Sequence, residues 1–218
     1  MTNIFKKENA FVITLIVSIL FLLVFYVLSY FQLIQSEESL SFIGEASRWC
    51  ERISAGVFRE PINTLTNLGF MVAGLYILHT LTNETSFNDF SGLNKLTILY
   101  GVAVVYLGPG SMMMHGTNTE WGGWADNLSM VIYIIIPWLY NIYKMSKWSV
   151  NTFLKVYISI VVFYAVMRGL FGYGMGIGLD LFGVSIGLWV ISEFLYRFWS
   201  PSMRFVSGFV GFLVLMIF

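Results

Sequence analysis

The sequence is poor in charged residues, histidine and cysteine. Charged side chains make up 11% of its 218 residues, against about 25% in soluble domains, so the chain cannot cover itself with a polar surface. The formal net charge is zero, which offers no basic patch to a nucleic acid. A single cysteine excludes a disulfide within the chain, and one or two histidines do not by themselves make a zinc site.

Hydrophobic residues are abundant and gather in long runs. They make up 57% of the chain, and a helix needs roughly 17–25 apolar residues to cross a bilayer. About seven runs reach this length or approach it: 11–31, 62–80, 97–116, 124–143, 152–170, 175–196 and 203–218. They lack the alternation typical of a β-barrel. The sequence therefore predicts an all-α polytopic transmembrane bundle, with residues 1–218 forming a single transmembrane domain.

The first run follows Lys6 and Lys7, as the apolar core of a secretory signal also does. It is longer than such a core and no small-residue cleavage site follows it, so we interpret 11–31 as a retained N-terminal helix. A loop at 32–60 precedes the rest of the bundle at 61–218. With a cytoplasmic N-terminus, eight of the 12 lysines and arginines lie on the inner side and four on the outer side, which is the positive-inside bias.

Polar residues stand out between the third and fourth runs, in "GPGSMMMHGTNTEWGGWADNLSM" at 108–130. Ser111 and His115 are four residues apart and share a helical face. The chain then turns and re-enters the membrane, so Asp126 is expected at the same outer level. An ionisable residue in a membrane segment is costly and is a functional candidate. His79 lies 19 residues after Glu60, which is expected at the outer level. At ~1.5 Å per residue His79 is about 28 Å deeper in the membrane, too far to share a site with His115.

Each of these residues also has a structural interpretation. His115 can be a buried histidine bonded to a neighbouring helix, and Asp126 can be a salt-bridge partner or a helix-start carboxylate. The methionines at 112–114 point in other directions and are most simply packing residues. A nucleophilic pair of Ser111 and His115 is disfavoured, because side chains at i and i+4 leave little room for a substrate carbonyl between them.

Four motifs, in this order, resemble the alkaline ceramidase family: "WCE" at 49–51, "EPINTLTNLGF" at 60–70, "GPGSMMMHGT" at 108–117 and "WADNLSM" at 124–130. That family belongs to a wider group of membrane hydrolases that includes the adiponectin receptors and the GPI-anchor remodelling lipases. The group shares S-x-x-x-H on one helix, an Asp on the next and H-x-x-x-H on the last. The resemblance covers roughly 47–218, and the helix at 11–31 looks like an addition of bacterial members, which implies a bacterial inner membrane.

The resemblance implies a zinc-dependent amidase acting on the N-acyl bond of ceramide or a related N-acyl lipid, so the expected partner is a membrane lipid. His115 would be a zinc ligand, Ser111 would steady the substrate carbonyl or oxyanion, and Asp126 would be the general base. Zinc lowers the pKa of its water to about 7 and polarises a carbonyl, which makes these roles one coherent reaction. Neither the other substrate-binding residues nor the oligomeric state follow from the sequence.

The chain departs from the family pattern after His115. It has no further histidine, so the H-x-x-x-H pair is missing, and it ends at "GFLVLMIF" where the family continues to one more helix. Cys50, which the resemblance would pair with a cysteine of the final outer loop, has no second cysteine here, although a free buried thiol is a simple alternative. We therefore expect a truncated chain that holds zinc weakly or not at all and is incomplete or inactive as an enzyme, unless the missing ligands come from elsewhere. The alternative is a non-catalytic receptor-like or transport-like bundle with a buried Ser/His/Asp cluster.

The resemblance also implies a possible calcium site at the outer end. Trp49 would contribute its backbone carbonyl, and Glu51 and Glu60 their carboxylates. Arg48 stands where the family has an acidic residue. The alternative is that the two glutamates pair with neighbouring arginines and that Glu60 simply begins a helix ahead of Pro61.

Other polar residues are interpreted as structural. Glu60, Asn63 and Asn67 recur at i, i+3 and i+7, a stripe expected to face other helices. Glu193 and Arg197 are predicted to pair at i and i+4. We also expect a pairing of the two charged residues that flank the glycine-rich turn "GLFGYGMGIG", Arg168 and Asp180.

Overall fold

The computed structural model describes residues 9–35, 40–84 and 91–198. Six helices of this part of the chain are long and apolar enough to cross a membrane. Within the same ranges, the sole β-type pairing is an isolated bridge between Ala46 and Arg52. The predicted all-α, multi-pass architecture is therefore confirmed. The predicted run at 203–218 lies outside the described residues.

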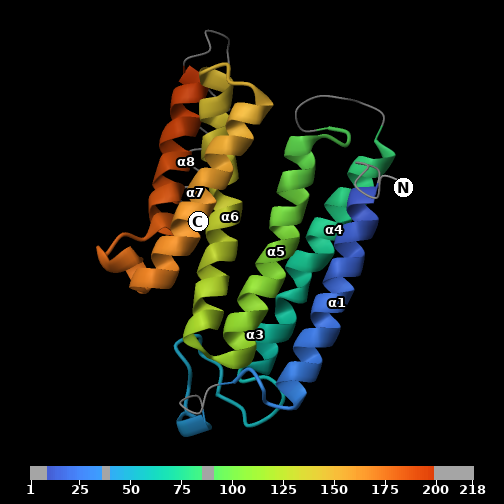
Figure 1. Ribbon diagram of the computed structural model, residues 1–218, viewed down its shortest axis with the longest axis vertical. Coiled ribbons are helices and arrows are strands. Elements are labelled where there is room, and N and C mark those ends of the chain that lie inside the picture. Colours follow the sequence, from blue (N-terminus) through green and yellow to red (C-terminus); the bar gives the residue numbers. More distant parts are fainter. Residues whose placement is uncertain (1–8, 36–39, 85–90, 199–218) are drawn as a thin grey trace. The chain divides into compact units, whose positions relative to one another are not determined.

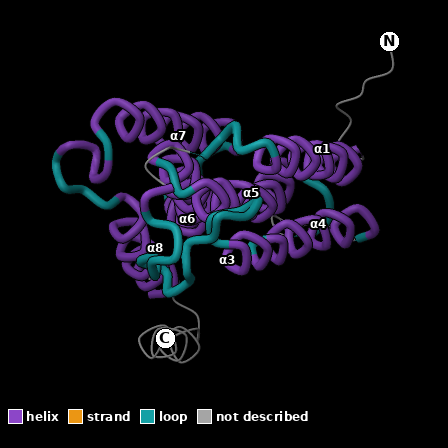
Figure 2. The backbone as a smooth tube through the Cα atoms, turned by 90° about the horizontal axis from the view of Figure 1, so that it is seen from below, coloured by secondary structure: helices purple, strands orange, loops and turns teal. Residues whose placement is uncertain are grey.

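The chain divides into two compact units, Met1–Tyr133 and Ile134–Phe218. The first contains α1 (Ala10–Tyr30), α3 (Pro61–Thr66), α4 (Leu68–Asn83), α5 (Lys95–Thr117) and the beginning of α6 (Glu120–Met145). In this unit α1 packs beside α4 and α5 (Figures 1 and 2). The predicted runs at 11–31, 97–116 and 124–143 correspond to α1, α5 and α6, with ends that differ by at most four residues.

Glycines let α4 and α5 come close together. A Cβ added to Gly74 would lie 2.5 Å from the Val105 backbone nitrogen and 2.8 Å from the Gly101 carbonyl oxygen. A Cβ on Gly101 would lie 2.7 Å from the Leu78 side chain. Small residues at such a seam allow the van der Waals contact that holds helices together where water is absent.

The predicted helix at 62–80 is interrupted at Asn67. The Asn67 side-chain amide donates to the carbonyl of Asn63 at 2.7 Å, an acceptor that the backbone N–H of residue 67 would use in a regular helix. The helix is thereby divided into α3 and α4. The side chains of the predicted stripe therefore bond to one another's residues: Asn63 donates to the Glu60 carboxylate and Asn67 donates to the Asn63 carbonyl. The stripe also lies on the segment that packs on α5.

A tight reversal joins α5 to α6. Asn118 follows α5 in the left-handed conformation, with φ of 52°, and its N–H donates to the Met114 carbonyl at 2.8 Å. The two helices then run antiparallel in close contact, because a Cβ on Gly110 would lie 2.4 Å from that of Ser129. This reversal places the start of α6 beside the end of α5, which we call the α5–α6 end of the unit.

The second unit contains the remainder of α6, α7 (Val150–Phe171), the short 3-10 helix η2 (Tyr173–Gly176) and α8 (Leu181–Phe198). The predicted start of the last described run, at 175, is wrong. The chain has positive φ values at Gly172, Gly174, Met175, Gly176 and Gly178, which a regular α-helix does not contain, and α8 begins only at Leu181.

Charged residues of the second unit take defined partners. Glu193 Oε1 accepts from Arg197 Nε at 2.6 Å, which confirms the predicted pair. Asp180 accepts from the Phe182 N–H at 3.1 Å, at the start of α8. The Arg168 guanidinium lies over the Tyr173 ring, 5.9 Å from its centroid.

Candidate functional site

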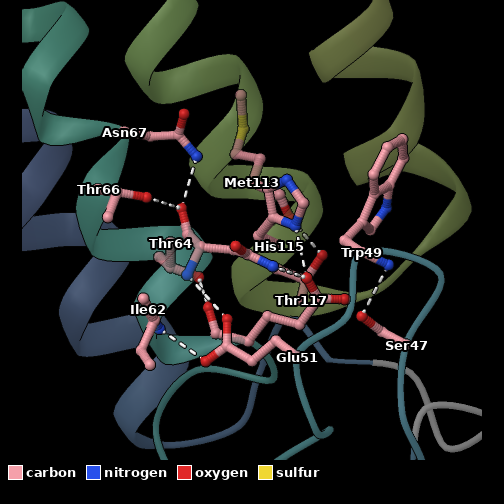
Figure 3. A network of polar contacts seen from close by, with 12 residues as sticks. Ser47, Trp49, Glu51, Ile62, Thr64, Thr66, Asn67, Met113, His115 and Thr117 are labelled. Atoms are coloured by element: carbon pink, nitrogen blue, oxygen red, sulfur yellow. Dashed lines mark hydrogen bonds and ion pairs between the residues drawn. The ribbon is translucent and has the colours of Figure 1, made fainter.

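His115 lies at the α5–α6 end, in the last turn of α5, and its imidazole contacts Glu60. The distance from His115 Nδ1 to Glu60 Oε2 is 2.7 Å, and the side chains are 13% and 2% exposed. Two backbone bonds fix the same pairing, from Glu60 N–H to the His115 carbonyl at 2.9 Å and from Arg59 N–H to the Gly116 carbonyl at 3.0 Å. The loop that precedes α3 is therefore attached to the end of α5 by main chain and side chain together (Figure 3).

The Glu60 carboxylate is ionised. Burial alone would raise its pKa, but the hydrogen bonds from His115 and Asn63, the charge of His115 and a hydrogen bond from Ser47 outweigh burial, and the pKa of Glu60 lies below its usual value. An ionised carboxylate can only accept hydrogen bonds. His115 Nδ1 must then be the donor, which leaves Nε2 as the nitrogen with a free lone pair when the ring is neutral.

Asp126 and Ser111 join the same cluster from neighbouring helices. Asp126 lies on α6 and is 8% exposed. Its carboxylate lies close enough to interact with the Ser111 hydroxyl and, electrostatically, with His115. The structure therefore brings together a hydroxyl, an imidazole and a carboxylate that the sequence places at positions 111, 115 and 126.

Trp49 and Glu51 lie at the edge of the cluster, on the loop before α3 (Figure 3). The Trp49 ring meets that of His115 edge-on, with centroids 5.9 Å apart. The Glu51 carboxylate accepts from the N–H groups of Ile62 and Asn63, both at 2.8 Å. Glu51 thus satisfies the first turn of α3, where N–H groups have no partner within the helix.

The calcium site at Trp49, Glu51 and Glu60 stays a prediction. In the structure both carboxylates already have partners: Glu51 holds the first turn of α3, and Glu60 holds His115 and Asn63. Glu60 also stands immediately before α3, with Pro61 in the first turn, as expected for a residue that begins a helix.

The contact between Glu60 and His115 was not predicted from the sequence, which assigned Glu60 to the calcium site and to the helix-facing stripe. The sequence did contain an indication of this contact, because Glu60 and His115 are expected at the same membrane depth. A carboxylate and an imidazole at one depth in a bundle are natural partners. Without the backbone pairing of residues 59–60 with 115–116, nothing in the spacing selects Glu60 rather than Glu51.

The zinc expected from the motifs fits this site only in part. A carboxylate on one imidazole nitrogen is the usual support of a metal-binding histidine, because it orients the ring and leaves the other nitrogen available. Over residues 9–35, 40–84 and 91–198, however, no group of three or more histidines, cysteines or carboxylates could hold a metal ion. His79 does not contribute, since it packs against Phe11 and contacts Asn83, on α4. The described residues provide one suitable ligand and do not complete a zinc site.

Fold and site together define a class: a multi-pass helical membrane protein with a polar Ser/His/Asp cluster at the α5–α6 end of its first unit. A family model described as Ceramidase matches residues 46–173, more than half of the 218 residues. The chain belongs to the ceramidase family, as the four motifs indicated. No curated protein and no solved structure matches it. The family membership supports a ceramidase-like hydrolase of amide bonds.

Proposed function

We propose that this protein hydrolyses the N-acyl bond of ceramide or of another N-acyl lipid within the membrane. One observation carries the proposal: Asp126, buried on α6, lies within interaction distance of Ser111 and His115. Buried polar groups on membrane-spanning helices are costly and mark functional sites. The match to the ceramidase family supports the reaction class.

The roles follow from the chemistry of each side chain. Asp126 takes the proton of the attacking water, which is the work of a general base. The Ser111 hydroxyl, which lies beside Asp126, can rotate and donate to the carbonyl oxygen as negative charge develops there. The C–N bond then breaks, and the proton passes to the leaving amine, giving a fatty acid and a free amine.

Zinc is the expected cofactor, with His115 as one ligand and Glu60 as the residue that positions it. When bound, such an ion polarises an amide carbonyl and lowers the pKa of a coordinated water. Because the described residues form no group of three potential ligands, we expect this chain to hold zinc weakly. Elemental mass spectrometry of the purified protein measures this, and a tightly held, stoichiometric ion would contradict it.

The general base is tested with Asp126→Ala. The purified protein in lipid nanodiscs is incubated with ceramide and zinc, and released fatty acid is measured by mass spectrometry. We expect turnover to fall by about 10²–10⁴-fold, the usual contribution of a general base. Asp180→Ala is the matched control, because Asp180 is a carboxylate at the start of α8 with a structural hydrogen bond.

Two outcomes contradict the proposal. Full turnover by the Asp126→Ala protein removes Asp126 as the base. An absence of turnover by the unaltered protein, with zinc supplied and with a panel of N-acyl lipids, contradicts hydrolysis by this chain and agrees with either an incomplete enzyme or the non-catalytic bundle. The observation that favours the non-catalytic alternative is that the described residues contain no group of three potential metal ligands.

A further inference from the structure

An apolar groove runs along α1 in the first unit. Its volume is about 510 Å³, within the range of roughly 300–1,000 Å³ common for ligand sites. One face of α1 lines it, with residues at helical spacing: Val17, Leu20, Phe21, Val24, Phe25 and Leu28. Ile34, Met113 and Trp121 complete the lining.

The groove is continuous with the lipid-facing surface of the protein. α1 is one of the helices able to cross the membrane, and Val17, Leu20 and Val24 are 58%, 55% and 56% exposed. An apolar cavity of this kind does not hold water, and the medium beside a spanning helix is hydrocarbon. The chemistry of the lining therefore selects an acyl chain.

The length of the groove agrees with one leaflet. Val17 and Leu28 are eleven positions apart, or about 16 Å at ~1.5 Å per residue. Half of a hydrocarbon core about 30 Å thick is ~15 Å. Leu28, near the end of α1, and Trp121, near the start of α6, line the same groove. Since tryptophan favours the membrane interface, the headgroup belongs at the Trp121 end.

The position of Met113 separates the groove from the polar cluster. Met113 lies two residues from both Ser111 and His115, which is about 200° around a helix of ~3.6 residues per turn. The groove therefore meets α5 on the side away from the face that carries the hydroxyl and the imidazole. A lipid held there does not present its headgroup to that face.

We propose that this groove binds one acyl chain of a bilayer phospholipid, aligned with α1 and with its headgroup at the Trp121 end. Such a lipid is a structural component that fills the space between α1 and Met113 of α5. The proposal does not depend on the hydrolase reaction, because it concerns the opposite face of α5.

Photocrosslinking tests this site. The protein is placed in nanodiscs of phosphatidylcholine with a small fraction carrying a photoactivatable diazirine in the acyl chain, and adducts are mapped by peptide mass spectrometry. We expect an adduct at Met113 that is lost as unlabelled phosphatidylcholine is raised. Val24→Trp fills the groove and should remove most of this adduct. Ile16→Trp, on the same helix and 51% exposed but outside the groove lining, should leave it unchanged.

Three results would overturn the assignment. The first is a Met113 adduct no stronger than that at Val162, a lipid-exposed residue of α7. The second is equal labelling of Met113 in the Val24→Trp and Ile16→Trp proteins. The third is displacement of the probe by ceramide at concentrations where phosphatidylcholine has no effect, which would make the occupant an N-acyl lipid rather than a bulk phospholipid.

Discussion

The replacement Glu60→Leu tests the pairing on which the geometry of His115 depends. Leucine fills a similar volume but accepts no hydrogen bond, so the Nδ1–H of His115 and the side-chain N–H of Asn63 both lose their acceptor. A buried donor left without a partner costs ~1–3 kcal/mol. Both donors here are half-buried rather than buried, so the two together are expected to cost about 2 kcal/mol, at the lower end of that range.

The assay uses the scarcity of histidine. The chain has two histidines, so a protein labelled with ¹⁵N-histidine gives two imidazoles, and His79, in its separate contacts on α4, is an internal reference. In the unaltered protein at a pH where the rings are neutral, the ¹⁵N shifts should place the His115 proton on Nδ1. In Glu60→Leu the His115 proton should no longer be confined to Nδ1. Glu60→Gln keeps a carbonyl acceptor, so the proton should stay on Nδ1, with the free energy of unfolding lowered by about 1–2 kcal/mol.

A matched carboxylate controls for general damage to the loop. Glu51→Gln weakens the first turn of α3 but leaves the partner of His115 in place. It should therefore lower the melting temperature without altering the imidazole shifts. The reasoning is refuted if the proton of His115 is found on Nε2 in the unaltered protein, or if Glu60→Leu leaves the tautomer unchanged.

Three further predictions concern packing, capping and pH. Gly74→Ala should destabilise the protein by about 1–3 kcal/mol, as overpacking does, because the new Cβ meets backbone atoms of Val105 and Gly101. Gly69→Ala is the control on the same helix, because nothing lies within 4 Å of its added Cβ. Equal melting temperatures for the two proteins would contradict the close packing of α4 on α5. Glu51→Gln should cost ~0.5–2 kcal/mol in thermal or denaturant unfolding, the value of an N-terminal helix cap, and a cost within error of zero would remove that role. Because the folded pKa of Glu60 is lowered, its stabilising contribution is present above the usual value near 4.5 and is lost as the pH falls through the folded pKa. Melting temperatures measured from pH 7 to pH 3 should therefore fall less steeply in Glu60→Gln than in the unaltered protein, and parallel curves would refute this linkage.

The spanning helices could be predicted because bilayer thickness imposes a length on apolar runs. α1, α5 and α6 end close to the predicted positions, and the family follows from motifs such as the one around Ser111 and His115. Depth and chain direction also placed Asp126 beside them, since a short turn between antiparallel helices brings their adjoining ends to one level.

Backbone details set by local hydrogen bonds could not be predicted in this way. The division of α3 from α4 depends on one amide of Asn67 turning back to Asn63. The late start of α8 depends on successive positive φ values around Met175, which hydropathy does not record. The partner of His115 depends on a backbone pairing between segments 55 residues apart, and a linear pattern does not specify that register.

The double attachment of residues 59–60 to the end of α5 has a mechanical consequence. The extramembrane loop and the imidazole move together, because the Glu60 carboxylate and the backbone N–H groups of residues 59 and 60 are all bonded to residues 115–116. A displacement of that loop from the aqueous side would therefore also move the imidazole.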